Sequence, residues 1–214
     1  MTGEPLLHVE GLIKRYQRGW RKTTTFELHA DFKIFEPGVY GVMGANGAGK
    51  TTLFELITGG NQPSEGRVLV GGQDIHGVRY GERSQLALHY HQSYQLRSFR
   101  RTRPAFMLER ALQPDAIVHL FDEPQFNTQD GYIGFMLDFF ARLRRNGKLV
   151  FLCLHPNEPV HLEILHQACE RFIFVRKDEA RVSRLLHADD FAALRQLPDV
   201  RSYLGGLCGC ADAL

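Results

Sequence analysis

The chain has 214 residues, 43% of them hydrophobic, so it is long enough to bury a sizeable core and matches the length of one large domain. Its 26 Lys and Arg residues nearly balance 24 Asp and Glu residues, which leaves a formal charge of +2. This balance excludes a strong overall electrostatic bias toward nucleic acid, so any such binding must come from a local patch.

The four cysteines lack the spacing of zinc ligands. Cys153 and Cys169 lie in apolar runs typical of buried strands, which favours a reduced cytosolic protein. Cys208 and Cys210, near the C-terminus, are interpreted as part of a loose end rather than as a metal or redox pair. The first residues lack the basic and apolar regions of a signal peptide, and no apolar run approaches the roughly 18 residues that span a bilayer. We therefore expect a cytoplasmic protein.

The predicted elements begin with an antiparallel β region and continue as alternating strands and helices. Apolar and polar residues alternate on either side of a basic turn, which predicts the two opening strands. Short apolar runs then alternate with helical spacing, which favours a mainly parallel α/β sheet flanked by helices. The expected strands are residues 6–16, 26–35, 39–43, 67–70, 86–90, 116–121, 148–154 and 172–175. The expected helices are residues 51–58, 103–112, 132–145, 159–168 and 188–197, the last ending at Pro198.

The run GANGAGKTT at positions 44–52 is a full P-loop motif between an expected strand and an expected helix. Its glycines let backbone amides turn toward phosphates without side-chain clashes, and the helix N-terminus adds its positive dipole. Lys50 is placed to reach the β- and γ-phosphates, and the Thr51 hydroxyl to bind magnesium. The motif therefore predicts a P-loop NTPase that binds ATP with Mg²⁺. The residues assigned to the nucleotide are Gly44, Asn46, Gly47, Ala48, Gly49, Lys50, Thr51 and Thr52.

Two adjacent acids, Asp122 and Glu123, follow the apolar run 116–121, at the strand end where α/β sheets place their ligands. Together with the P-loop, this pair resembles the ATP-binding subunits of ABC transporters, and the resemblance covers roughly residues 5–185. It implies that Asp122 holds magnesium and that Glu123 is the general base for the attacking water.

The resemblance assigns three further positions. It implies that His155, after the strand 148–154, contacts the γ-phosphate, so that the catalytic set is Glu123, His155 and Lys50. Gln92 resembles the Gln that completes the magnesium shell, with Gln95 as the alternative. Tyr16, after the first strand, resembles the aromatic residue on which adenine stacks.

One region departs from the family pattern. An ordinary ABC subunit carries a multi-helix subdomain before the acid pair, but only 30 positions separate Gln92 from Asp122, so we expect that subdomain to be reduced to about residues 93–113. The run SFRRT at 98–102 occupies the place of the signature motif, and arginines replace the glycines that cradle the partner's γ-phosphate. Thr128 stands where the family carries an Asp that acts across the dimer.

These features predict a single ABC ATPase-like domain over residues 1–214, with a C-terminal tail at 186–214. The residues expected to contact the chain's own nucleotide match the family pattern. Those expected to contact the nucleotide of a partner subunit differ from it. The resemblance therefore implies an ATPase that is weak alone and forms a heterodimer with another ABC ATPase carrying an intact signature. An integral membrane permease is the further expected partner, which would place the chain on the cytoplasmic face of the membrane.

Two alternatives stay open. The basic run 97–103, with Phe99 interleaved, would suit a soluble non-transport ABC-type ATPase or regulator that contacts nucleic acid, although the near-neutral charge disfavours nucleic acid. The second alternative is a P-loop kinase that phosphorylates a small molecule, for which the P-loop alone would be sufficient. The paired acids and His155 speak against a kinase.

Overall fold

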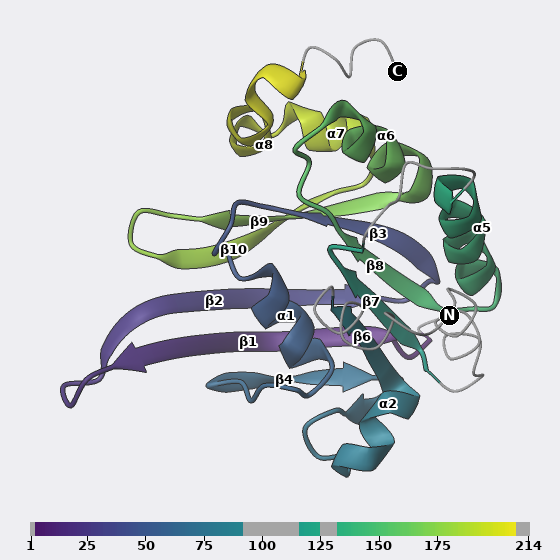
Figure 1. The fold of residues 1–214 in the computed structure, drawn as a ribbon. Helices are drawn as coiled ribbons and strands as arrows, with labels where there is room; N and C mark the ends of the chain where they lie inside the picture. The colour runs from purple at the N-terminus through teal and green to yellow at the C-terminus, as the bar shows by residue number, and fades with distance from the viewer. Residues whose placement is uncertain (1–2, 92–115, 125–131, 209–214) are drawn as a thin grey trace, which may run out of the picture.

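The computed structural model describes residues 3–91, 116–124 and 132–208, in which ten strands form one sheet (Figure 1). The strand order is β5-β4-β1-β2-β10-β9-β3-β8-β7-β6. The strands are β1 (Leu7–Arg18), β2 (Thr23–Ile34), β3 (Gly38–Met43), β4 (Glu65–Val70), β5 (Gln73–Asp74), β6 (Ala87–His91), β7 (Val118–Asp122), β8 (Leu149–Cys153), β9 (Arg171–Lys177) and β10 (Val182–Ala188). The helices are α1 (Lys50–Ile57), α2 (Arg83–Leu86), α5 (Tyr132–Arg145), α6 (Pro159–Ala168), α7 (Phe191–Gln196) and α8 (Pro198–Leu204), with short 3-10 turns η1 (Tyr80–Glu82) and η2 (Gly205–Cys208).

The antiparallel and parallel regions are parts of the same sheet. β1 pairs antiparallel with β2 and β4, whereas β9, β3, β8, β7 and β6 run parallel to one another. The join is the parallel pairing of β10 with β2, which places Val182 opposite Glu27. β10 is also the antiparallel neighbour of β9. The expected antiparallel opening is therefore continuous with the parallel sheet through a strand that the sequence pattern did not predict.

The C-terminal tail differs from the single helix expected at residues 188–197. Ala188 ends strand β10, and the Asp190 side chain caps α7 by accepting a 2.7 Å hydrogen bond from the Ala193 amide. Pro198 begins helix α8 instead of ending a helix, because its fixed φ and missing N–H suit the first helical turn. The prediction of one helix was therefore wrong, and two short helices follow the strand.

The core forms two hydrophobic clusters, one on each face of the sheet, because successive strand residues point to opposite faces. In β3, Val42 joins the cluster that includes the α1 residues Leu53 and Phe54, whereas Met43 joins the cluster that includes residues of α5–α8. Figure 1 shows α5–α8 grouped together, away from α1. The sheet thus has a hydrophobic cluster on each face, and β3, which precedes the P-loop, contributes to both clusters.

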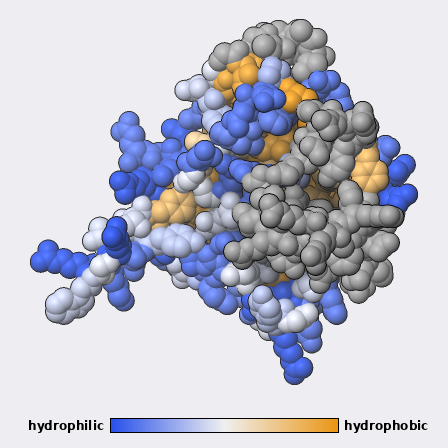
Figure 2. All heavy atoms as spheres, viewed as in Figure 1, coloured by the Kyte–Doolittle hydropathy of each residue, from blue (hydrophilic) through white to orange (hydrophobic). Residues whose placement is uncertain are grey.

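The β1–β2 hairpin ends in a turn that projects from the molecule (Figure 2). Trp20 is 102% exposed there, next to exposed Arg18, Arg21 and Lys22. None of the helices within the described ranges combines the length and the apolar composition needed to cross a bilayer.

Cys153 and Cys169 are free and buried. Cys153 lies in β8, as predicted, but Cys169 follows the last residue of α6 and precedes β9, so its predicted place in a strand was wrong. The Cys169 thiol is buried at the C-terminal end of a helix, and burial raises its pKa. Cys210 lies outside the described residues, and the Cys208 side chain is also not described.

Candidate functional site

The loop between β3 and α1 is shaped by three glycines with positive φ. Gly44, Gly47 and Gly49 have φ values of 149°, 71° and 101°. A Cβ on Gly44 would lie 2.5 Å from the Val175 carbonyl oxygen, and one on Gly49 would lie 2.7 Å from Cζ of Phe26. Gly47 faces open space. Close packing therefore requires glycine at the two ends of the loop, and backbone conformation favours it at all three positions.

The loop borders a cleft of about 450 Å³. The cleft lies between the P-loop, the β1–β2 hairpin and the end of β7, so three separate parts of the chain form its walls. Its lining residues are Tyr16, Thr25, Phe26, Asn46, Gly47, Gly49, Lys50, Thr51, Thr52 and Glu123. The structure thus brings together most of the residues that the P-loop motif and the resemblance assigned to the nucleotide.

Lys50 is held against the loop by its own ammonium group. Its Nζ donates hydrogen bonds of 2.8 Å to the carbonyl oxygen of Gly44 and 3.1 Å to that of Ala45. The side chain is only 7% exposed, so its aliphatic part is packed and its charge is directed along the loop. A cation fixed in this way presents positive charge to an anionic ligand at little cost in side-chain entropy.

Thr51, which lines the cleft, bonds the buried side chain of Asp122. The Thr51 hydroxyl donates a 2.8 Å hydrogen bond to Oδ2 of Asp122, and Nε2 of His89 lies 3.5 Å from the same oxygen. Burial raises the pKa of the Asp122 carboxyl, but hydrogen bonds from His89 and Thr51 outweigh burial and hold that pKa below its usual value. Asp122 is therefore an anion at neutral pH, although its side chain is almost fully buried.

The Thr51–Asp122 pair has the chemistry of a magnesium site. A hydroxyl and a carboxylate are hard oxygen donors, and Mg²⁺ in phosphate-binding sites takes only one or two carboxylates from the protein. Within the described residues no group of three or more His, Cys, Asp and Glu side chains is arranged to hold a metal. The donor set therefore fits a cation whose remaining ligands come from a phosphate and water.

Glu123 lies in the left-handed region of backbone conformation, with φ 51°. This conformation costs a non-glycine residue about 1–2 kcal/mol, and the 3.0 Å hydrogen bond from the Glu123 amide to the Cys153 carbonyl fixes it. The turn separates the two neighbouring acids. The Asp122 side chain is buried beside Thr51, whereas exposed Glu123 lines the cleft.

Two aromatic rings form the end of the cleft on the β1–β2 hairpin. Tyr16 and Phe26 are paired across the strands, and their ring centroids are 6.0 Å apart. Tyr16 is 37% exposed, and its hydroxyl accepts a 2.7 Å hydrogen bond from Nδ2 of Asn61. An exposed aromatic face at this end suits a flat heteroaromatic ring.

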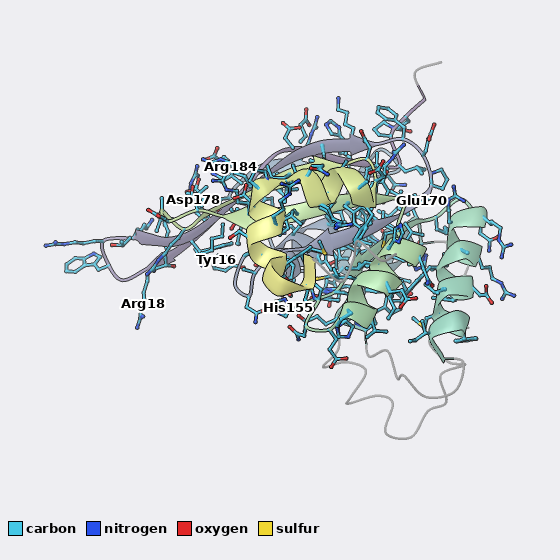
Figure 3. All side chains as sticks on the ribbon, turned by 90° about the horizontal axis from the view of Figure 1, so that it is seen from above. Tyr16, Arg18, His155, Glu170, Asp178 and Arg184 are labelled. Atoms are coloured by element: carbon cyan, nitrogen blue, oxygen red, sulfur yellow. The ribbon has the colours of Figure 1, made fainter. Side chains whose placement is uncertain are left out.

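His155 follows β8 and is not among the residues that line the cleft. Its Nδ1 lies 2.6 Å from the Tyr203 hydroxyl, and Figure 3 labels His155 beside the C-terminal helix α8 (yellow). Gln92, Gln95, the run 98–102 and Thr128 lie outside the described residues.

Three residues of the site were missed by sequence reasoning. Phe26 had a usable signal, because it stands opposite Tyr16 in a two-stranded register. His89 had no usable signal in the sequence. It comes near Asp122 only because β6 pairs with β7, with His91 of β6 opposite Asp122. Tyr203 lies 48 positions from its partner His155 in a tail with no motif.

Residues 28–128 match the sequence profile of the family described as "ABC transporter". That range contains the whole P-loop and both acids, of which Glu123 lines the cleft and Asp122 is buried beside Thr51. The chain is therefore similar to this family over those residues, which are slightly less than half of its length. The structure confirms the expected α/β P-loop fold, and nucleotide binding is the function of such a domain.

Curated relatives of the chain include two bacterial ATP-binding proteins. The chain is 37% identical over 75 residues to the fructose import ATP-binding protein FrcA of Rhizobium meliloti, which is 35% of this chain and 27% of that protein. It is 35% identical over 86 residues to the lipoprotein-releasing system ATP-binding protein LolD of Xylella fastidiosa, which is 40% of this chain and 35% of that protein. The chain thus spans 27–35% of the length of these two curated relatives.

Solved structures of ATP-binding cassettes share the fold of this chain. A dimeric ATP-binding cassette bound to ADP and phosphate has a TM-score of 0.63 at 15% identity, covering 86% of this chain and 98% of that one. CbiO1 of Clostridium perfringens, part of an ABC transporter complex, has a TM-score of 0.62 at 15% identity, covering 94% of this chain and 95% of that one. The likeness therefore extends over nearly all of the chain, beyond the matched range.

Proposed function

We propose that the protein binds ATP with Mg²⁺ and hydrolyses it as the nucleotide-binding subunit of an ABC transporter or ABC-type complex. The observation that carries this proposal is the cleft, which is lined by a fixed cation, an exposed Glu123 and two aromatic rings, and whose Thr51 bonds the buried, ionised Asp122. We also propose that residues 1–214 are a single domain of this type.

Each part of the cleft has a role in this proposal. Lys50 and the loop amides would neutralise the phosphates, and Tyr16 would stack on adenine. Thr51 and Asp122 would hold Mg²⁺, which supplies positive charge to the phosphate oxygens when bound. Glu123 would accept a proton from the attacking water, and its exposure leaves its carboxylate accessible to water. His155 is proposed to donate a hydrogen bond to the γ-phosphate.

The partners are part of the proposal. The arginines at 98–102 replace small residues that would expose bare amides, which supports a site completed by a second ATPase with an intact signature. The import and release systems named for FrcA and LolD support association with a membrane permease at the cytoplasmic face. The alternative of a soluble ATPase that contacts nucleic acid has only the run 97–103 in its favour.

The proposal is tested by measuring ATP binding and turnover with the purified chain of residues 1–214. We expect Lys50→Ala to abolish detectable ATP binding, because it removes the fixed cation, and Glu123→Gln to keep the affinity while turnover falls by about 10²- to 10⁴-fold. The matched control is Lys33→Ala, which removes an exposed lysine of β2 outside the cleft.

Two results would contradict parts of the proposal. Wild-type protein that binds no ATP with Mg²⁺ overturns the nucleotide site. Fast hydrolysis by a dilute sample shown to be monomeric overturns the need for a partner ATPase, because the chain would then complete its own site.

A further inference from the structure

The C-terminal helix α8 makes a direct contact with His155. The Tyr203 hydroxyl lies 2.6 Å from Nδ1 of His155, and the two ring centroids are 5.8 Å apart. Tyr203 lies outside the matched range 28–128, so the family match assigns it no role. The contact joins helix α8 to the end of β8, the strand between β3 and β7.

Contacts other than the one with His155 hold the Tyr203 ring in place. The ring packs edge-on against Phe174 of β9, with centroids 5.4 Å apart. Val200 and Leu204 of the same helix are buried, and a 3.0 Å ion pair between Arg176 and Asp199 ties α8 to β9. The helix is therefore anchored by its own packing. This packing holds the Tyr203 hydroxyl close to His155.

The proton arrangement follows from the chemistry of the two groups. Burial raises the pKa of the Tyr203 phenol, and nearby Glu123 adds to the shift, so the phenol keeps its proton near neutral pH. A phenol that donates to Nδ1 requires this nitrogen to carry no proton. Neutral imidazole then has its proton on Nε2, which becomes a hydrogen-bond donor on the opposite edge of the ring.

We propose that Tyr203 is a positioning residue whose hydroxyl donates to Nδ1 of His155 and so holds the imidazole as the Nε2–H tautomer that donates to the terminal phosphate of ATP. This inference rests on the proposed nucleotide site. It makes helix α8 part of that site, because the helix fixes both the ring orientation and the proton of His155.

Tyr203→Phe is the test variant, because it keeps the ring on Phe174 and removes only the hydroxyl. The matched control is Tyr40→Phe, which removes another partly buried phenol, one that bonds Arg171 at 3.1 Å. The first measurement is long-range ¹H–¹⁵N NMR of the nucleotide-free chain, with His155 assigned by the loss of its signals in His155→Gln. We expect the Nε2–H pattern for His155 in wild type and Tyr40→Phe, and a mixture of tautomers in Tyr203→Phe.

The second measurement is made with nucleotide. A non-hydrolysable ATP analogue with Mg²⁺ should shift the His155 Nε2 proton in wild type and shift it less in Tyr203→Phe. With ATP, kcat should fall by about 5- to 10-fold in Tyr203→Phe, the loss of one well-placed hydrogen bond, while the Kd for ATP changes less than about twofold.

The outcomes separate this inference from the proposed function. An Nδ1–H pattern in wild type, or an unchanged pattern in Tyr203→Phe, overturns the role of Tyr203 even if the protein hydrolyses ATP. If the tautomer changes as expected but the analogue does not shift the Nε2 proton, the positioning of His155 toward phosphate is overturned. Failure of wild type to bind ATP overturns the proposed function, and with it that phosphate contact, while the nucleotide-free spectra still report the tautomer.

Discussion

The Thr51 hydroxyl donates a 2.8 Å hydrogen bond to Oδ2 of Asp122, across 71 positions of the chain. Thr51 is in the first turn of α1, and Asp122 is the last residue of β7. The bond therefore links the P-loop helix to the strand that carries the acids. The same two oxygens are the protein groups that we assign to Mg²⁺.

Thr51→Val tests this assignment, because it removes the hydroxyl and keeps the branched shape. We expect the gain in ATP affinity on adding Mg²⁺ to fall by about tenfold or more, with affinity in EDTA nearly unchanged. The control is Thr58→Val, whose hydroxyl bonds the Phe54 carbonyl at 2.9 Å outside the cleft. Titrations of ATP with and without Mg²⁺ measure the effect, and equal Mg²⁺ dependence in wild type and Thr51→Val would contradict the assignment.

Two substitutions at Tyr16 distinguish the role of its ring from the role of its hydroxyl. Loss of one stacked base costs roughly 1–3 kcal/mol, so Tyr16→Ala should raise the Kd for ATP by at least about fivefold. Tyr16→Phe keeps the ring and loses only the hydrogen bond from Asn61, so its affinity should stay close to that of wild type. Isothermal titration distinguishes the two variants. If Tyr16→Phe weakened binding as much as Tyr16→Ala, the Asn61 contact would be the important one.

Gly44 and Gly47 offer a comparison within one loop. A Cβ at Gly44 would meet the Val175 carbonyl oxygen at 2.5 Å, whereas one at Gly47 meets nothing within 4 Å. Gly44→Ala should therefore lower the free energy of unfolding by about 2–4 kcal/mol, from strain plus overpacking. Gly47→Ala should cost about 1–2 kcal/mol, from backbone conformation alone. Urea unfolding of both variants measures this difference, and equal losses would mean that β9 does not restrict the loop.

His119 should make stability depend on pH. It is fully buried in β7, and burial, with a smaller effect from Lys148, lowers its pKa from 6.5 to about 4. Between these values the unfolded chain binds a proton that the folded chain does not. The contribution of neutral His119 to the free energy of unfolding is therefore complete above pH 6.5, decreases as the pH falls, and is lost below pH 4.

The expected loss from this single group is about 2–3 kcal/mol on going from about pH 7.5 to about pH 4.5. His119→Phe removes the titration and keeps a ring stacked on Tyr90, so its unfolding free energy should depend less on pH by that amount. Urea unfolding at both pH values provides the comparison with wild type. Parallel pH dependence in the two proteins would show that His119 is not the responsible group.

Much of the fold could be predicted from local patterns in the sequence. The helices α5 and α6 have the predicted bounds, and the predicted strand before the P-loop and helix after it match β3 and α1 closely. These segments were predictable because their apolar spacing and their turn residues are encoded within a few neighbouring positions. Strand β10 was missed because its pairing with β2 and β9 joins segments far apart in the sequence.

The sequence alone determined the chemistry of the proposed phosphate site, because the P-loop is a contiguous run of residues that a motif identifies. It also placed Asp122 and Glu123 together at the end of a strand. Only the tertiary structure decided that Asp122 turns inward to Thr51 and His89 while Glu123 lines the cleft, because the turn depends on a bond from Glu123 to the neighbouring strand β8. The contact between Tyr203 and His155 likewise exists only because α8 folds back onto β9, through packing between distant segments that no local motif encodes.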